Sequence, residues 1–385
     1  MDRNTGVSRR GMLGVAATGA ILRGSRVDAM RRRQAATGMP QEGATTPHLC
    51  LGPIADRELT PDGIRRYTQL GLSHIILNGG GFPWEADALR AKVRVLRENG
   101  LTVGDIGLPW SGSAGAAMRE IVGAGPGRNQ AIEEICRSIR AAAAAGIPLV
   151  EYNFYAHRLE EGYAEVPDPA RGDAMVESFD YARVRDLRPL LGEAARTLDE
   201  LWANCAYFLK RVVPVAEDAG VVLALHPNDP PAPLSRGSRQ IMATLDGWKK
   251  FVRLHDSPAN TIIFDCGVTR ELGEDPVKVA HWFASRKRIG LVHYRNVRLR
   301  KAYLYYTEVY PDNGDIDMLA VMQALVDYRY TSMIFPEHAR GLDFDRVLQT
   351  GNYAAAVFHI GYTRAMLQVA LMSRGRYAGA GRVRE

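Results

Sequence analysis

Four short apolar stretches in the second half of the chain each end in a residue that can bind a divalent metal. They cover residues 220–225, 261–264, 289–292 and 331–335, with segments of helical pattern between them. The carboxyl ends of parallel strands meet at one mouth of a β/α barrel, so side chains there can converge on one ion. The candidate ligands at these four ends are His226, Cys266, His293 and Glu337.

This ligand set would offer two imidazole nitrogens, a thiolate and a carboxylate to one cation. Imidazole and carboxylate ligands suit Mn²⁺, Fe²⁺, Co²⁺ or Zn²⁺, and the sulfur of Cys266 disfavours Mg²⁺ and Ca²⁺. A single histidine of this kind would more simply be a hydrogen-bonded core residue. Because all four residues lie at successive strand ends, the pattern predicts one shared transition-metal site.

Polar side chains next to the candidate ligands predict what the site binds. Asp229 follows His226 closely and is placed among the catalytic residues. The planar guanidinium of Arg295 is expected to clamp a substrate carboxylate. Residues 307–318 are polar and contain a turn at Asn313-Gly314, so they are expected to form a loop over the site. The other predicted substrate contacts are Asn228, Asn296 and Asn153. Such surroundings favour a small, polyhydroxylated, anionic substrate.

The elements that must position these residues repeat one strand–helix unit. Strands are expected over residues 48–54, 73–78, 101–108 and 148–156, ahead of the four stretches that end in the candidate ligands. One helix is expected to begin at Pro61 after the N-cap Thr60, and further helices are expected near residues 85–99, 128–145, 194–218, 240–255, 275–286, 315–329 and 352–373. Eight such units predict a (β/α)8 TIM barrel in one domain. Residues 158–189 are too long for an ordinary connection and are interpreted as an insertion after strand 4 that forms a lid or an oligomer contact.

Composition and charge exclude several classes of protein. The chain has 385 residues and a net charge of +6, but the excess of arginine lies in its first 45 residues and in its tail from Ser373. The remainder is slightly acidic, which argues against a nucleic-acid partner. No apolar run in the body is long enough to span a membrane. The four cysteines are too few for a disulfide framework.

The first 45 residues are predicted to be an export signal or a disordered tail. Arg9 and Arg10 precede a short Ala/Gly-rich apolar run, which resembles a twin-arginine signal for periplasmic export. A basic tail on a cytoplasmic protein is the alternative interpretation. The barrel domain is expected over residues 46–375, and residues 376–385 form a basic C-terminal tail.

Several motifs resemble the mannonate dehydratase family, whose members are metal-dependent barrels of the xylose-isomerase-like fold. These motifs are ALHPNDPP (224–231), HYRNV (293–297), NGDIDM (313–318), PEHAR (336–340), GNY (351–353) and GYTRA (361–365). The resemblance implies loss of water from D-mannonate to give 2-keto-3-deoxy-D-gluconate, with Mn²⁺ or a similar divalent cation. It also implies that His338 and Tyr353 move protons, that Arg340 contacts the substrate, and that the four candidate ligands bind the metal.

The chain departs from the family pattern at three positions beside the site. The family usually has Asp at Glu337, Arg at Phe335 and Asp at Asn228. These departures leave open a related aldonic acid as substrate. They also leave open a sugar isomerase or epimerase on the same metal site, and a sugar-acid-binding relative without catalysis. A metal-dependent endonuclease is disfavoured by the acidic body. A homo-oligomer is expected.

Overall fold

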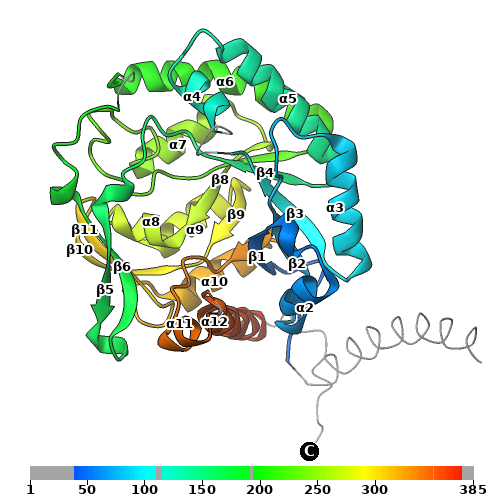
Figure 1. Ribbon diagram of the computed structural model, residues 1–385. Coiled ribbons are helices and arrows are strands. Elements are labelled where there is room, and N and C mark those ends of the chain that lie inside the picture. Colours follow the sequence, from blue (N-terminus) through cyan, green and yellow to red (C-terminus); the bar gives the residue numbers. More distant parts are fainter. Residues whose placement is uncertain (1–38, 110–114, 191–193, 350, 375–385) are drawn as a thin grey trace, which may run out of the picture.

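The computed structural model describes residues 39–109, 115–190, 194–349 and 351–374. Eight parallel strands close into a barrel in the order β1-β12-β9-β8-β7-β4-β3-β2 (Figure 1). The strands are β1 (His48–Ile54), β2 (His74–Leu77), β3 (Thr102–Gly107), β4 (Leu149–Tyr152), β7 (Val222–Leu225), β8 (Asn260–Asp265), β9 (Ile289–His293) and β12 (Met333–Phe335). The predicted (β/α)8 barrel is therefore confirmed.

Helices surround the barrel on its outside (Figure 1). They are α2 (Pro61–Gln69), α3 (Ala86–Glu98), α4 (Ala116–Val122), α5 (Arg128–Ala144), α6 (Leu198–Ala219), α7 (Leu245–Leu254), α8 (Cys266–Glu271), α9 (Pro276–Ala284), α10 (Met318–Asp327), α11 (Asp343–Leu348) and α12 (Tyr353–Ser373). The predicted start of α2 at Pro61 is confirmed, and the hydroxyl of the N-cap residue Thr60 accepts a hydrogen bond from the Gly63 N–H. The start of α10 lies later than expected, since Asp317 caps it and not Asp315.

Alternation along the strands decides which side chains reach the mouth of the barrel. Seven buried side chains fill the barrel interior: Cys50, Ile76, Leu149, Ala224, Ile263, Leu291 and Met333. Successive residues of a strand point to opposite faces, so the second residue after an interior one points inward again. His226, Asp265 and His293 stand two residues beyond Ala224, Ile263 and Leu291, and therefore share the inner face at the carboxyl end.

The predicted insertion forms half of a second sheet. Its strands β5 (Tyr163–Asp168) and β6 (Ala174–Asp180) pair antiparallel, and β6 pairs with β11 (Tyr305–Val309), which pairs with β10 (Asn296–Lys301). The expectation of a loop over residues 307–318 is thus wrong for its first part, which is strand β11. Single 3₁₀ turns flank these strands: η2 (Glu160–Gly162), η3 (Pro169–Arg171) and η4 (Tyr181–Arg183), while η1 (Asp56–Glu58) follows β1.

Two predictions concern segments that fall largely or wholly outside the described residues. One is the export signal or disordered tail predicted over residues 1–45, of which residues 1–38 lie outside the described residues, and the other is the basic tail predicted over residues 376–385. Among the described helices, none combines the length and apolarity that a membrane crossing needs.

Candidate functional site

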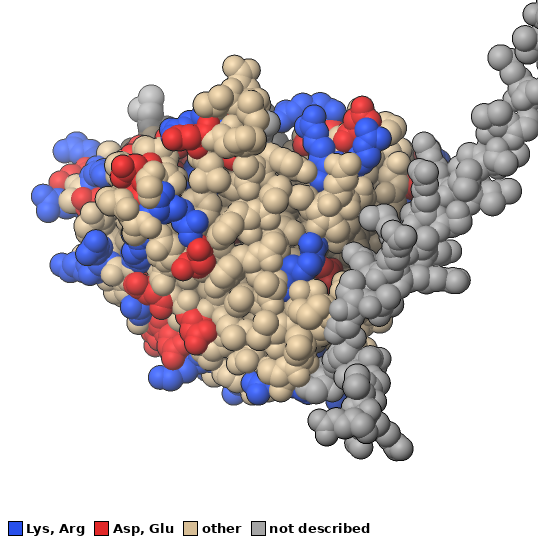
Figure 2. Space-filling view, turned by 90° about the horizontal axis from the view of Figure 1, so that it is seen from below, with Lys and Arg blue, Asp and Glu red and all other residues tan. Residues whose placement is uncertain are grey.

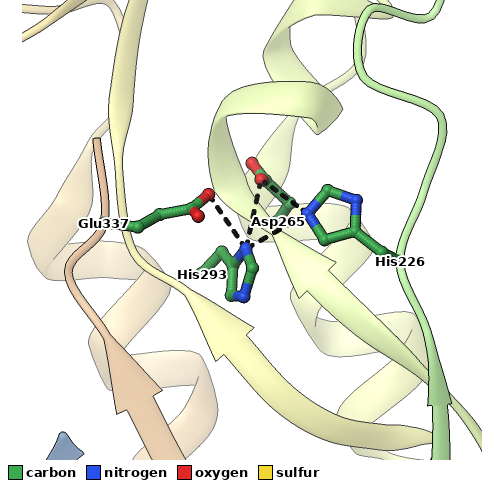
Figure 3. A group of neighbouring side chains, drawn as sticks. All are labelled: His226, Asp265, His293 and Glu337. Atoms are coloured by element: carbon green, nitrogen blue, oxygen red, sulfur yellow. Dashed lines mark hydrogen bonds and ion pairs between the residues drawn. The ribbon is translucent and has the colours of Figure 1, made fainter. Parts of the chain in front are cut away.

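Four side chains converge at the carboxyl mouth of the barrel: His226, Asp265, His293 and Glu337. One ligand atom from each lies within 4.8 Å of the others (Figure 3). His226 Nε2 is 3.2 Å from His293 Nδ1, and Glu337 Oε1 is 2.9 Å from the same nitrogen. The nearer Asp265 oxygen lies 3.9 Å from His226 Nε2 and 3.7 Å from His293 Nδ1. Two nitrogens and two oxygens therefore face one point.

The carboxylate of Asp265 stands where the sequence analysis expected the thiol of Cys266. Asp265 ends β8 in register with His293 of β9, so both side chains point into the barrel. Cys266 is the next residue and begins α8, and its side chain packs in the buried core between the barrel and the helices. Burial raises the pKa of the Cys266 thiol, which disfavours the thiolate that metal binding requires. Asp265, and not the predicted Cys266, therefore belongs to the metal group.

The electrostatics of the group fit a cation. Burial lowers the pKa of His226 to about 4, so this imidazole is a neutral ligand near pH 7. Burial also opposes charge on His293, but the carboxylates of Glu337 and Asp265 outweigh it and raise its pKa to about 10. A proton on His293 therefore stands where a divalent ion would stand. Imidazole and carboxylate ligands in this number suit a divalent transition metal.

Arg295 is buried beneath the group and is only 2% exposed. Its N–H groups donate to Asp265 at 3.0 Å, to Glu271 at 2.8 Å and to Asp229 at 3.1 Å. Although burial acts to raise it, the Arg295 charge holds the pKa of Asp265 well below its ordinary value. Because protein carboxylates already engage the guanidinium, this geometry argues against the expected clamp on a substrate carboxylate. Arg295 instead orients Asp265.

His338 lies next to the metal group and contacts a second carboxylate. Its Nδ1 is hydrogen-bonded to Glu308 of β11, and its Nε2 is 3.5 Å from Glu337. Burial opposes the charge, but Glu308 outweighs it and raises the pKa of His338 to about 10. The backbone of His338 has a φ of 53°, a left-handed conformation that is costly outside glycine and often marks a functional residue. The arrangement suits a proton donor.

Asp229 completes a second group with Glu308 and His338, whose ligand atoms lie within 4.8 Å of one another. The hydroxyl of Tyr163 donates to Asp229 at 2.5 Å and contacts the hydroxyl of Tyr306 at 2.7 Å. Tyr163 comes from the insertion, which thus reaches the site through β5. Glu308 and Tyr163 were not among the residues predicted for the site. Glu308 lies within the polar stretch 307–318, but no sequence signal points to Tyr163.

Two of the predicted substrate contacts, Asn228 and Asn296, are hydrogen-bonded to the protein backbone, so their side chains are not open to a substrate. The Asn228 carboxamide oxygen accepts from the backbone N–H of Met242 at 2.8 Å. The Asn296 amide donates to two backbone carbonyls of the loop before α10. Both side chains are buried. Asn153 lies one residue beyond β4 and is half-buried. Asn228 and Asn296 therefore stabilise loops beside the site.

The two remaining predicted residues lie on the outer side of the site. Arg340 forms an ion pair with Glu177 of β6. The Tyr353 hydroxyl donates to the backbone carbonyl of Arg66 in α2 at 3.3 Å. A cavity of about 690 Å³ is lined by Tyr353 together with Glu337 and His338. This volume is within the range of roughly 300–1,000 Å³ that small-molecule sites occupy.

Comparisons with known proteins point in one direction. The family model described as D-mannonate dehydratase (UxuA) matches residues 176–370, which include both groups described above. A mannonate dehydratase of Streptococcus suis (strain 05ZYH33) is 31% identical over 249 residues, 59% of this chain and 68% of the relative. A mannonate dehydratase of Streptococcus uberis (strain ATCC BAA-854 / 0140J) is 28% identical over 275 residues, 65% of this chain and 78% of the relative.

Solved structures show the same fold. The crystal structure of mannonate dehydratase from Streptococcus suis serotype2 is similar with a TM-score of 0.71 and 23% identity, covering 88% of this chain and 98% of that chain. D-psicose 3-epimerase from Clostridium cellulolyticum H10 is similar with a TM-score of 0.53 and 15% identity, covering 82% and 95%. At these identities the likeness concerns the fold alone.

Proposed function

The chain belongs to the mannonate dehydratase family of hydro-lyases, and from this premise we propose that it removes water from D-mannonate or a related aldonic acid. The product from D-mannonate would be 2-keto-3-deoxy-D-gluconate. One observation carries the proposal: two imidazole nitrogens and two carboxylate oxygens converge within 4.8 Å at the barrel mouth. They do so beside His338, whose position and charge suit proton transfer.

Dehydration of a sugar acid requires a base for the proton next to the carboxylate and an acid for the departing hydroxyl. A divalent cation, when bound by His226, Asp265, His293 and Glu337, would supply Lewis-acid stabilisation of the negative charge that develops. Arg295 orients Asp265 in this ligand set. The two proton transfers are assigned to side chains that line the cavity.

His338 is the proposed acid. Its raised pKa keeps it protonated near pH 7, and Glu308 fixes the ring through Nδ1. The other ring nitrogen, Nε2, is left to face the substrate and to give its proton to the leaving hydroxyl. Tyr353 lines the same cavity and is proposed as the second proton-transfer group. Its hydroxyl would exchange the bond to the Arg66 carbonyl for one to the substrate.

The proposed metal is Mn²⁺ or another divalent transition ion. The group offers nitrogen and oxygen ligands, and imidazole suits the first-row transition metals better than Mg²⁺ or Ca²⁺. The metal content of the purified protein, measured by inductively coupled plasma mass spectrometry, tests this choice. Mg²⁺ or Ca²⁺ as the retained ion would contradict it.

The test of the function uses protein loaded with Mn²⁺ and a panel of aldonic and uronic acids. We expect a 2-keto-3-deoxy product from D-mannonate or a close relative, and no product from the His226→Ala variant. Mass spectrometry separates dehydration from isomerisation, because isomerisation conserves the mass of the sugar. Bound metal without dehydration of any acid would refute the lyase proposal and favour an isomerase, an epimerase or a binding protein.

We further propose that the protein is a homo-oligomer. Large apolar side chains on α11 and α12 are exposed, with Val347 at 79% and Phe344 at 63%. Figure 2 looks at the side of the molecule where these helices lie and shows a broad uncharged surface. Exposed apolar patches on soluble proteins commonly mark association surfaces. A monomeric mass in light scattering at micromolar concentration would contradict this proposal.

Periplasmic localisation by twin-arginine export is also a proposal. It rests on Arg9 and Arg10 and on the apolar run that follows them. Fractionation of cells that express the full chain tests it against a variant in which both arginines are replaced by lysine. Equal distribution of the two proteins in the cytoplasm would contradict export.

A further inference from the structure

The cavity over the metal group has a wall that the proposed mechanism does not use. The barrel contributes Glu337 and His338, and the start of α12 contributes Asn352 and Tyr353. Helix α2 also lines the cavity, through Arg66 and Gln69. The cavity has a volume of about 690 Å³, which leaves room for substrate atoms beyond those that the metal group and His338 would contact.

Arg66 differs from the other arginines near the site because it lacks a carboxylate partner among the described residues. Arg295 is hydrogen-bonded to three buried carboxylates, and Arg340 forms an ion pair with Glu177. Arg66 is exposed, and it is the only lysine or arginine among the described residues that line the cavity. A guanidinium held in a cavity wall without a partner is suited to bind an anion from solution.

Glu58 is the one carboxylate besides Glu337 among the described residues that line the cavity, and it is already engaged. Glu58 accepts a hydrogen bond from the Tyr67 hydroxyl at 2.8 Å and another from the Ala55 N–H at 3.0 Å. Polar amides of Gln69 and Asn352 flank the cavity and suit sugar hydroxyls. The α2 side of the cavity therefore combines one available cation with the neutral amide of Gln69.

Arg66 and the metal group reach the cavity from different layers of the barrel. It belongs to a helix of the outer ring, whereas Glu337 follows a barrel strand directly. The hydrogen bond from Tyr353 to the Arg66 carbonyl ties the start of α12 to α2, so the two helices form a joined wall. A sugar acid whose carboxylate end lies at the metal group would extend its other end toward this wall.

We propose that Arg66 is a specificity-determining residue that binds an anionic group at the far end of the substrate. The substrate class would then be a sugar acid with a second anionic group, either a carboxylate, as in an aldaric acid, or a phosphate. This inference rests on the proposed function, because it assumes that the carboxylate next to the reacting carbon lies at the metal group. Both anions present the oxygens that a guanidinium binds in a bidentate manner.

The experiment compares three acids that differ only at the far end: D-mannonate, D-mannarate and 6-phospho-D-mannonate. Binding to the Mn²⁺-loaded full chain is measured by isothermal titration calorimetry, and turnover by formation of 2-keto-3-deoxy product. We expect the wild-type protein to favour at least one dianionic acid over D-mannonate by about 10- to 100-fold, since a hydrogen bond to a charged group is worth that much. Preference for one dianion identifies whether the far group is carboxylate or phosphate.

Three variants isolate the role of the side chain. Arg66→Gln should abolish the preference for the dianionic acids, while Arg66→Lys should keep part of it because the charge remains. Arg65→Gln is the matched control: Arg65 is the neighbouring residue of α2, pairs with Asp62 on the surface and does not line the cavity. Its preference should equal that of the wild type. Circular dichroism and metal content confirm that each variant is folded and loaded.

The outcomes separate this inference from the proposed function. Dehydration of D-mannonate without any gain for the dianionic acids, or a gain that survives Arg66→Gln, overturns the role of Arg66 and leaves the function standing. Failure to dehydrate any acid overturns the function, and the binding measurements then decide on Arg66 alone. Binding of none of the three acids overturns both.

Discussion

The replacement of Asp265 by asparagine should remove metal binding while the fold remains. The asparagine has the same size and keeps an oxygen that can cap α8, where Asp265 accepts a hydrogen bond from the Val268 N–H at 2.8 Å. What it loses is the negative charge that faces His226 and His293 at 3.9 and 3.7 Å. Arg295 would retain Glu271 and Asp229 as partners.

The size of the effect follows from these distances. Two unit charges about 4 Å apart interact by about 4 kcal/mol at an effective dielectric constant of about 20. The interaction with a divalent ion would be larger, but the ion also gives up hydration when it binds. We therefore expect the dissociation constant of Mn²⁺ to rise by at least about 100-fold, which corresponds to roughly 3 kcal/mol.

The assay is a calorimetric metal titration of the metal-free protein, with Cys266→Ala as the matched control. Cys266 is adjacent in sequence but packs in the core, so its removal should change metal affinity less than about threefold. It should cost about 1 kcal/mol in the free energy of unfolding because a small cavity is left. Loss of metal in Cys266→Ala together with retention in Asp265→Asn would refute the assignment of ligands.

The remaining predictions concern protons, catalysis and the fold. The pKa of His293 in the folded protein is raised to about 10 from an ordinary value near 6.5, so its proton stabilises the metal-free protein fully below about pH 6.5. This stabilisation is lost as the pH rises toward 10, and the melting temperature of the metal-free protein should fall over that range. A melting temperature that rises over the same range would contradict this prediction. For the same reason apparent Mn²⁺ affinity should rise about tenfold per pH unit between pH 6 and 9, because binding displaces that proton. Glu308→Gln should lower kcat by at least about tenfold and leave the metal content unchanged. Thr307→Val, at the preceding position of β11, should change neither kcat nor metal content. An unchanged kcat in Glu308→Gln would show that His338 does not need this partner. Asp317→Ala should cost about 1 kcal/mol of stability in a urea titration, since it removes the cap of α10, and an unchanged urea midpoint would contradict that role.

The fold could be predicted from local signals, because each unit carries its own. Apolar stretches of strand length alternate with capped helices, and Thr60-Pro61 and Asp275-Pro276 mark helix starts that the structure confirms. The place of the site followed as well, since parallel strands all end at one mouth. His226, His293 and Glu337 were found for this reason.

The identity of the fourth residue in the metal group depended on tertiary structure. Asp265 and Cys266 are neighbours, and only the register of β8 against β9 decides which one faces the barrel interior. A shift of one residue along a strand moves a side chain to the opposite face, so the sequence alone could not choose between them. The same limit explains why the prediction for Arg295 as a substrate clamp was wrong. Its hydrogen-bond partners Asp229, Asp265 and Glu271 lie 24 to 66 residues away in the sequence.

The insertion shows what only long-range pairing could decide. Its strands β5 and β6 join β10 and β11, which lie more than 100 residues later in the chain, and this pairing brings Tyr163 to Asp229 and Glu308 to His338. Residue types and local spacing determined the barrel, the mouth and the kind of chemistry. Contacts between segments far apart in sequence decided which acids face the two histidines of the metal group, which acid contacts His338, and which arginine stays available, because such contacts leave no local pattern to detect.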